Sequence, residues 1–270
     1  MIELAPYHKM GLPVENPILL AGGTVGYGEA AHPGIDFSAL GGVVAGPVTA
    51  HSAAGSAPPR YAAVEGGMVL AGEKQNRGVK TAIKRFAKLW SGLGCPVIVQ
   101  IADTQPEYAG RVARRLHEAP GVSGIELLLP EHGDEAHMEQ LVQSVVRAGD
   151  LPVWVKLPPA RAVQIAPLTV GAGAAAIVVG QPPTGSAIRT QDDQSVEGRF
   201  YSPSVFPLML ATLQEVAALR LPCALIACGG VHTVRHVRQA LEAGAQAVQI
   251  DSAVWVEPGL PAYLARAWAE

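Results

Sequence analysis

The sequence predicts an α/β protein of 270 residues that folds as one domain, a (β/α)8 or TIM barrel spanning residues 1–270. Short apolar segments alternate with amphipathic segments from one end of the chain to the other, and we count eight of the apolar kind. Several are too continuously apolar for a strand with one face in water, which favours parallel strands buried on both faces. Eight strand–helix alternations in a chain of this length indicate a closed barrel, with a doubly wound open sheet as the alternative.

The expected strands share a short apolar run, bounded in most cases by glycine or proline. They are residues 16–23, 41–49, 96–102, 124–130, 152–158, 174–180, 223–230 and 247–253.

Helical spacing is clearest in two segments. Residues 134–149 place Met138, Leu141, Val142, Val145 and Val146 on one face, with Asp134 and Glu135 in the first turn and Gly149 after the last. Residues 235–245 repeat the pattern with Val237, Ala240 and Leu241 facing inward and Gly244 as the stop.

Two connections are too long for tight turns, residues 50–78 and residues 181–203. Both follow barrel strands, so we expect them at the C-terminal face of the barrel, where barrel active sites lie. Residues 181–203 are polar and rich in turn-forming residues, which predicts either a mobile lid or a disordered surface loop.

Bulk properties exclude several classes of protein. The net charge of −3 and the absence of a basic run argue against nucleic-acid binding. No apolar run reaches the roughly 18 residues of a membrane span, and the N-terminus lacks a signal-peptide pattern. The spacing of Cys95, Cys223 and Cys228 suggests neither disulfides nor a zinc site. We therefore expect a cytoplasmic protein with reduced thiols.

Four strings together resemble the class 1 dihydroorotate dehydrogenases. Residues 16–29 (NPILLAGGTVGYGE) are similar to the family's A-S-G-T-F-G-Y-G opening, and residues 58–78 to its P-P-R…G-M-L-N segment. Residues 152–159 (PVWVKLPP) resemble its V-K-L-S-P strand, and residues 227–253 its G-G-I…A-G-A…V-Q-V-G-T-A ending. The resemblance runs from about residue 10 to 260 and implies a barrel that binds FMN and oxidises dihydroorotate in pyrimidine biosynthesis.

The resemblance also implies where FMN lies. Its phosphate would sit where the seventh and eighth strands end, at Gly229, Gly230 and Ser252, and Gly22, Gly23 and Gln100 would also bind the cofactor. The alternative for the glycine pair is a plain strand-to-helix turn. Asp251 stands where the family has glycine, and a carboxylate beside a phosphate dianion is repulsive unless it points away or a cation intervenes.

Lys156 is the strongest single candidate. An inward-facing lysine on an apolar strand is costly unless it is paired. In the family the matching lysine contacts the flavin near N1 and O2, where a fixed cation stabilises the reduced form. The alternative is a lysine that pairs with an internal carboxylate such as Glu126.

The family's catalytic base is missing from this sequence. Its Asn-Ile-Ser-Cys-Pro-Asn motif follows the fourth strand, with cysteine as the base in class 1 and serine in class 2. An ungapped count places Leu128 at the first asparagine and Glu131 at the base, and alignment on Pro130 deletes the Ser-Cys pair. Glu131 is our first candidate for a replacement base and His132 the second. The alternative is a solvated loop that opens a helix.

Most of the family's substrate-binding side chains are also replaced. Gly46 stands at its lysine, and Leu70, Gln100 and Gln181 stand at or near three of its asparagines, whereas Asn76 is retained. Asn76 and Gln181 are therefore the candidate substrate-binding residues. A site built on hydrogen bonds loses selectivity steeply when these partners go, which argues for a changed substrate.

Two further features are less specific. Glu73 and Lys74 replace apolar residues beside the expected pocket, and they either bind a charged ligand or pair with each other. The five-residue spacing of His132 and His137 is not that of a zinc-binding helix, so we predict no metal.

Two hypotheses follow from the sequence. One is an FMN-dependent oxidoreductase that transfers a hydride from a small substrate, such as dihydroorotate or a changed one, to FMN. The other is a flavin-free or catalytically silent barrel that serves binding or assembly. The resemblance also allows a homodimer, or a partner subunit that carries an iron–sulfur cluster and FAD.

Overall fold

The computed structural model describes residues 1–29, 32–72 and 75–270. Within these residues, eight parallel strands close into a barrel in the order β10-β13-β14-β3-β4-β7-β8-β9. The barrel strands are β3 (Ile18–Leu20), β4 (Gly42–Val48), β7 (Val97–Ile101), β8 (Gly124–Leu128), β9 (Val153–Leu157), β10 (Ala176–Val179), β13 (Ala224–Cys228) and β14 (Ala247–Ile250). Each lies inside one of the predicted segments, so the (β/α)8 prediction is confirmed and the open-sheet alternative is wrong.

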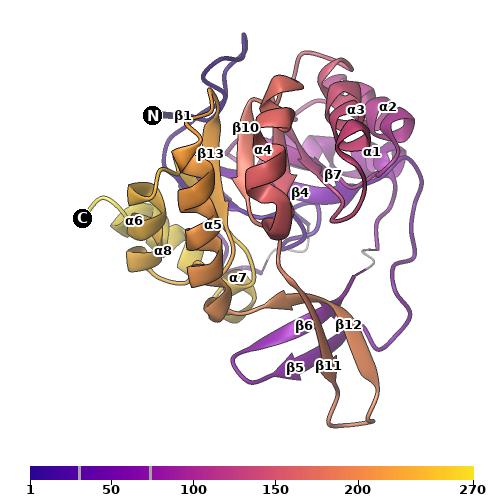
Figure 1. Ribbon diagram of the computed structural model, residues 1–270, viewed down its shortest axis with the longest axis vertical. Coiled ribbons are helices and arrows are strands. Elements are labelled where there is room, and N and C mark those ends of the chain that lie inside the picture. Colours follow the sequence, from indigo (N-terminus) through magenta and orange to yellow (C-terminus); the bar gives the residue numbers. More distant parts are fainter. Residues whose placement is uncertain (30–31, 73–74) are drawn as a thin grey trace.

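Helices cover the outside of the barrel (Figure 1). They are α1 (Val79–Trp90), α2 (Pro106–His117), α3 (Glu135–Val146), α4 (Ala162–Gly171), α5 (Phe206–Ala218), α6 (Val234–Glu242), α7 (Ala253–Val256) and α8 (Leu260–Ala267). The predicted start of α3 and the predicted end of α6 agree with the structure, because a capping residue marks each of them. The Asp134 side chain accepts a hydrogen bond from the His137 N–H at 2.6 Å, and Gly244 has φ of +110° just after α6.

Along each barrel strand, side chains point alternately outward to the helices and inward to the barrel interior. On β9, Val153, Val155 and Leu157 pack outward against the helices. Trp154 instead joins an interior cluster with Leu19 and Ile98. This cluster also includes Leu4, Leu12 and Val14, from the segment that forms the antiparallel pair β1 (Ile2–Glu3) and β2 (Pro13–Val14). That segment therefore closes the amino end of the barrel with apolar side chains.

The two long connections form an additional sheet, which we call the outer sheet. Its strands are β5 (Tyr61–Val64), β6 (Gly67–Ala71), β11 (Thr184–Ile188) and β12 (Ser195–Tyr201), antiparallel in the order β11-β12-β6-β5. Figure 1 shows it projecting from one end of the barrel. Residues 181–203 thus contain two paired strands, β11 and β12. Each hairpin covers the polar edge of the other through the β6–β12 pairing.

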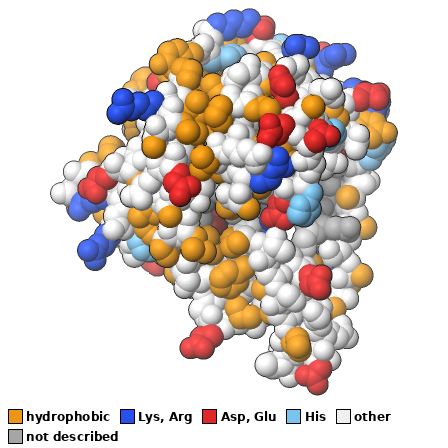
Figure 2. All heavy atoms as spheres, in the orientation of Figure 1, with side chains coloured by type: hydrophobic (Ala, Val, Ile, Leu, Met, Phe, Trp, Pro, Cys, Tyr) orange, Lys and Arg blue, Asp and Glu red, His pale blue; other side chains and the backbone are white. Residues whose placement is uncertain are grey.

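The visible charges in one view of the molecule are mixed (Figure 2). Side chains of both signs are scattered over the face seen in Figure 2, in keeping with the net charge of −3. Across the described ranges, we find no helix long and apolar enough to cross a membrane.

Gly198 tests the outer sheet. A Cβ at this position would lie 1.8 Å from the Leu70 carbonyl oxygen on the neighbouring strand, so the β6–β12 pairing requires glycine. We expect Gly198→Ala to lower the free energy of unfolding by about 3 kcal/mol, or to release the outer sheet alone.

Calorimetry and limited proteolysis distinguish these two effects of Gly198→Ala. Gly171→Ala is the matched control, because a Cβ there meets nothing within 4 Å. Unchanged stability and protease resistance in Gly198→Ala would contradict the observed strand pairing.

Candidate functional site

A cavity of about 660 Å³ opens at the carboxyl ends of the barrel strands. Each barrel strand contributes a lining residue at or just beyond its end: Gly22, Pro47, Gln100, Leu128, Lys156, Gln181, Cys228 and Asp251. The outer sheet and its flanks complete the wall with Asn76, Arg199 and Tyr201. The position of the cavity follows from the parallel strands, which all end at the same rim.

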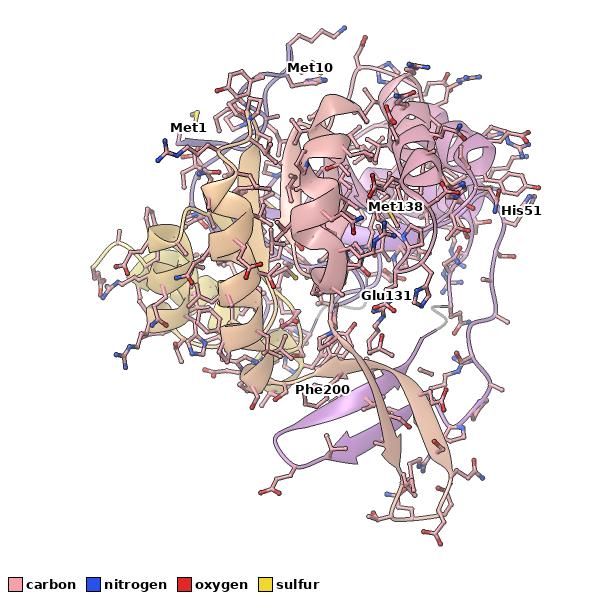
Figure 3. All side chains as sticks on the ribbon, viewed as in Figure 1. Met1, Met10, His51, Glu131, Met138 and Phe200 are labelled. Carbon is pink, nitrogen blue, oxygen red and sulfur yellow. The ribbon has the colours of Figure 1, made fainter. Side chains whose placement is uncertain are left out.

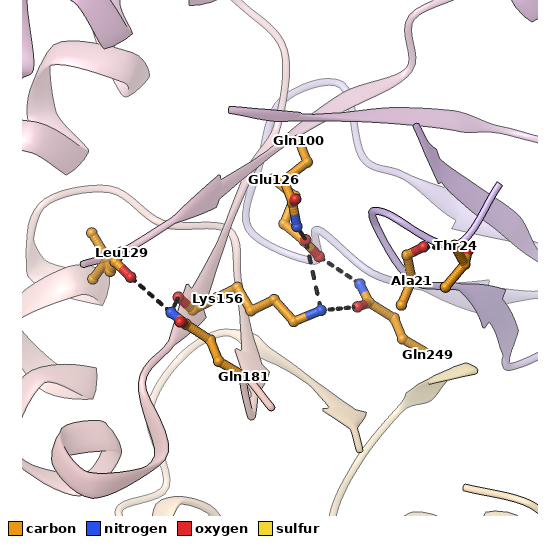
Figure 4. Close-up of polar contacts among 8 residues, drawn as sticks. All are labelled: Ala21, Thr24, Gln100, Glu126, Leu129, Lys156, Gln181 and Gln249. Carbon is orange, nitrogen blue, oxygen red and sulfur yellow. Dashed lines mark hydrogen bonds and ion pairs between the residues drawn. The ribbon is translucent and has the colours of Figure 1, made fainter. Parts of the chain in front are cut away.

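A buried polar network forms the floor of the cavity (Figure 4). The Lys156 ammonium donates to Gln249 Oε1 at 2.7 Å and lies 3.9 Å from Glu126 Oε1. Gln249 Nε2 donates to Glu126 Oε2 at 2.5 Å, and Gln100 Nε2 donates to Glu126 Oε1 at 2.7 Å. Both side-chain oxygens of Glu126 therefore have hydrogen-bond partners, as a fully buried polar group requires.

The charge of Lys156 follows from these neighbours. Burial by itself lowers the pKa of this ammonium, but the acidic groups around it, Glu126 and Asp251 among them, oppose that effect and hold the pKa above its ordinary value. Burial raises the pKa of the Cys228 thiol to about 11, so that thiol is neutral at pH 7. Lys156 is thus a fixed cation that both lines the cavity and pairs with Glu126. The two sequence interpretations of Lys156 are compatible.

Asp251 is the other buried ionisable group at the floor. It is 5% exposed, and burial raises its pKa, an effect that Lys156 and His232 oppose. Burial lowers the pKa of His232, so this neighbour tends towards the neutral imidazole. The Tyr201 ring lies 5.2 Å from the Trp255 ring, and burial together with Asp251 raises the Tyr201 pKa to about 12.

Glu131, the first candidate base, is engaged elsewhere. Figure 3 shows it on the side of the barrel that faces the outer sheet. Its carboxylate pairs with the Arg199 guanidinium of β12 and accepts a hydrogen bond from Thr184 Oγ1 at 3.0 Å. Arg199 lines the cavity, whereas Glu131 does not. Glu131 thus anchors the outer sheet to the loop after β8.

His132 is exposed and does not line the cavity. His137 lies on α3, and its Nε2 is 2.8 Å from the Thr104 carbonyl oxygen. Over the part of the chain that the structure describes, no group of three or more His, Cys, Asp and Glu side chains is placed to hold a metal ion. Glu73 and Lys74 lie outside the described residues.

The two candidate substrate-binding amides both line the cavity. Asn76 Oδ1 accepts from Thr49 Oγ1 at 2.8 Å and from the Gly78 N–H at 2.9 Å, so its amide nitrogen is the group left for a ligand. Gln181 Nε2 donates to the carbonyls of Leu129 and Lys156, so its oxygen is left instead. The cavity therefore offers one donor and one acceptor at these amides.

The glycines expected around the cofactor divide into two groups. Gly22 lines the main cavity, and a Cβ there would lie 2.6 Å from the Gln100 amide nitrogen. Gly23 lines a second, adjoining cavity. Gly229 and Gly230, like Ser252, are not among the residues that line the main cavity. Both have positive φ, and a Cβ on Gly230 would lie 2.4 Å from the Phe206 backbone nitrogen, so the turn itself requires glycine there.

Several lining residues escaped the sequence analysis. Arg199 and Tyr201 come from a segment expected to be a loop, and Trp255 from the helix after β14. Cys228 could have been found, because it ends an apolar strand two residues after the inward-facing Ile226.

Fold and cavity together define a (β/α)8 barrel of the class that carries its ligand site at the carboxyl ends of the strands. Residues 7–263 match the family Dihydroorotate dehydrogenase. The protein named dihydroorotate dehydrogenase B (NAD(+)), catalytic subunit, of Desulforudis audaxviator is 34% identical over 275 residues, which cover 94% of this chain and 88% of that protein. The protein of the same name in Citrifermentans bemidjiense is 30% identical over 273 residues, covering 95% of this chain and 89% of its own.

A solved structure agrees at the level of the fold. DHODH from Eimeria tenella in complex with ferulenol has a TM-score of 0.75 and 15% identity, over 93% of this chain and 79% of that one. The chain belongs to the dihydroorotate dehydrogenase family, a family of flavin enzymes that oxidise dihydroorotate.

The floor network makes a prediction about stability. We expect Lys156→Met to lower the free energy of unfolding by about 3–5 kcal/mol, because it leaves the Glu126 carboxylate buried and uncompensated. The double variant with Glu126→Gln removes that charge and should recover part of the loss. Urea denaturation of both variants measures the coupling, and additive effects would show that the two groups do not interact.

Proposed function

We propose that this chain is an FMN-dependent oxidoreductase that acts on a substrate other than dihydroorotate. The main support is the fixed cation of Lys156 at the floor of a cavity of about 660 Å³. When bound, FMN supplies the capacity to accept a hydride from an organic substrate. The membership of the chain in the dihydroorotate dehydrogenase family makes FMN the first cofactor to test.

The residues present are compatible with the ring of a flavin. Gln100 Oε1 is buried and has no hydrogen-bond partner among the described residues, so it can accept from a ligand N–H. Gly22 keeps the space above Gln100 free of a side chain. Lys156 supplies a positive charge where negative charge gathers on reduction. These three residues would hold the ring.

The phosphate end is less well matched. His232 Nε2 is buried and lacks a partner within the described ranges, but His232 lines neither cavity. The nearby carboxylate of Asp251 opposes an anion. This carboxylate also favours a second candidate function, a flavin-free barrel used for binding.

A changed substrate is supported by the groups that surround the cavity. Glu131 replaces the family's base in an ungapped comparison, but its carboxylate is held by Arg199 and Thr184. Gly46 provides no cation, and Leu70 provides no amide. A site that lacks both the base and these polar partners is poorly suited to dihydroorotate.

The names of the relatives suggest an assembly. They are catalytic subunits whose names include NAD(+). We propose by analogy that this chain passes electrons to a partner subunit, with an iron–sulfur and FAD protein as the first candidate. Co-purification from the native host tests this proposal.

The proposed function is tested by titrating the purified chain with FMN. We expect saturable one-to-one binding, because Lys156 and Gln100 complement the ring. Changes in the visible flavin spectrum measure this binding. Dithionite should reduce the bound flavin without oxygen, whereas dihydroorotate should leave it oxidised. A protein that does not bind FMN would support the flavin-free alternative, and fast reduction by dihydroorotate would contradict the changed substrate.

Asp251→Asn tests the phosphate end. Removing the carboxylate should tighten FMN binding roughly tenfold at pH 7, because one like charge near the phosphate is lost. Riboflavin, which has no phosphate, is the control ligand and should bind both proteins equally. An unchanged FMN affinity would show that Asp251 does not oppose the phosphate.

The same substitution also has a pH-dependent effect on stability. The folded-state pKa of Asp251 is raised above the unfolded value, so the folded protein holds this proton more tightly. Its contribution to stability therefore falls as pH rises from the ordinary carboxyl pKa towards the folded one. Asp251→Asn should remove this part of the decline in the free energy of unfolding with rising pH. Denaturation measured at a series of pH values from acid to neutral tests this.

A further inference from the structure

A second cavity, of about 310 Å³, adjoins the main one. Pro47, Arg199, Tyr201 and Trp255 line both, so these side chains form the boundary between the two spaces. The far wall of the second cavity includes Arg60, at the start of the outer sheet, and Gly46, at the end of β4.

The described lining of the second cavity carries two cationic side chains. Among its described lining residues, the ionised side chains at pH 7 are the guanidinium groups of Arg60 and Arg199, and none is a carboxylate. The Arg60 group donates to the carbonyls of Ser56 and Ala54 at 2.8 and 3.3 Å, and to Gln75 Oε1 at 3.1 Å. These neutral acceptors orient the guanidinium but do not neutralise it.

Arg199 differs from Arg60 in this respect. It pairs with Glu131, so much of its charge is already compensated at the rim. Within the described residues, Arg60 makes no ion pair with a carboxylate. A guanidinium on a cavity wall that has no carboxylate partner among the described residues is suited to bind an oxyanion through two parallel hydrogen bonds.

At Gly46 the wall of the second cavity carries no side chain. The family pattern has lysine at this position, whereas Gly46 contributes no side chain. Its φ of +105° and the 3.2 Å approach of a Cβ to the Gln100 carbonyl oxygen show that this backbone does not suit a larger residue. The described cationic side chains of this cavity therefore come from the outer sheet and its flank, at Arg60 and Arg199.

We propose that the second cavity is an anion subsite, and that the ligand of the main cavity extends past Pro47 and Trp255 to place a carboxylate or phosphate group at Arg60. The proposal rests on the proposed function only in treating that ligand as the substrate. The subsite itself depends on the cavity and on the two guanidinium groups.

Isothermal titration calorimetry of the whole chain tests the subsite, with malonate, inorganic phosphate and neutral malonamide as probes. We expect one saturable site for at least one anion and none for malonamide, and the tighter anion identifies the terminal group. Arg60→Gln should weaken binding about tenfold or more, since it removes the uncompensated charge. Arg60→Lys should bind with intermediate affinity, because it keeps the charge and loses the planar fork.

Arg189→Gln is the matched control. Arg189 follows β11 in the outer sheet but lies outside both cavities and is near Asp192, so its loss should leave anion binding unchanged. The subsite is overturned if neither anion binds the wild type, or if Arg60→Gln and Arg60→Lys both bind as the wild type does. Circular dichroism checks that each variant is folded.

The flavin content of each sample separates the two proposals. A protein that binds the anions but not FMN would retain the subsite and contradict the proposed function. A protein that binds FMN but neither anion would retain the proposed function and contradict the subsite.

Discussion

The ion pair of Lys156 and Glu126, enclosed by two glutamine amides, is the interaction on which the site depends. A closed parallel barrel turns every second side chain inward, and near the amino end those side chains are apolar, as Trp154 and Ile98 illustrate. One layer nearer the carboxyl end, the polar network replaces them. In this layer the Lys156 ammonium and both Glu126 oxygens have partners, which allows a charged pair to remain buried beneath a cavity, whereas Gln100 Oε1 has none among the described residues.

The outer sheet supplies part of the cavity wall. It encloses the space above the network, and it is anchored where Arg199 meets Glu131. In the ungapped comparison, Glu131 occupies the position of the family's base, so a position linked to proton transfer in the family holds the outer sheet here. The same strand places Arg199 and Tyr201 between the two cavities. One strand therefore both carries the contact to Glu131 and lines the two cavities.

Local patterns predicted the barrel well, because buried parallel strands are continuous apolar runs and helix ends carry caps such as Asp134. They did not predict the outer sheet, whose strands are half exposed and pair across long separations, as Leu70 with Arg199. For the same reason the partner of Glu131 was not foreseeable. Lys156 was found because a charge on an apolar strand stands out, whereas Arg60 and Arg199 lie in polar segments where arginine is ordinary.

If FMN binds above the floor network, the Lys156 cation should stabilise its reduced form. The most direct test is the reduction potential of bound FMN in the wild type, in Lys156→Met, and in Lys156→Met combined with Glu126→Gln. In Lys156→Met the reduction potential of FMN should be more negative than in the wild type, because the positive charge that favours the reduced flavin is lost. In the double variant, where the buried carboxylate is also gone, the potential should still lie below the wild-type value. Equal potentials and equal FMN affinity in all three proteins would contradict this role of Lys156.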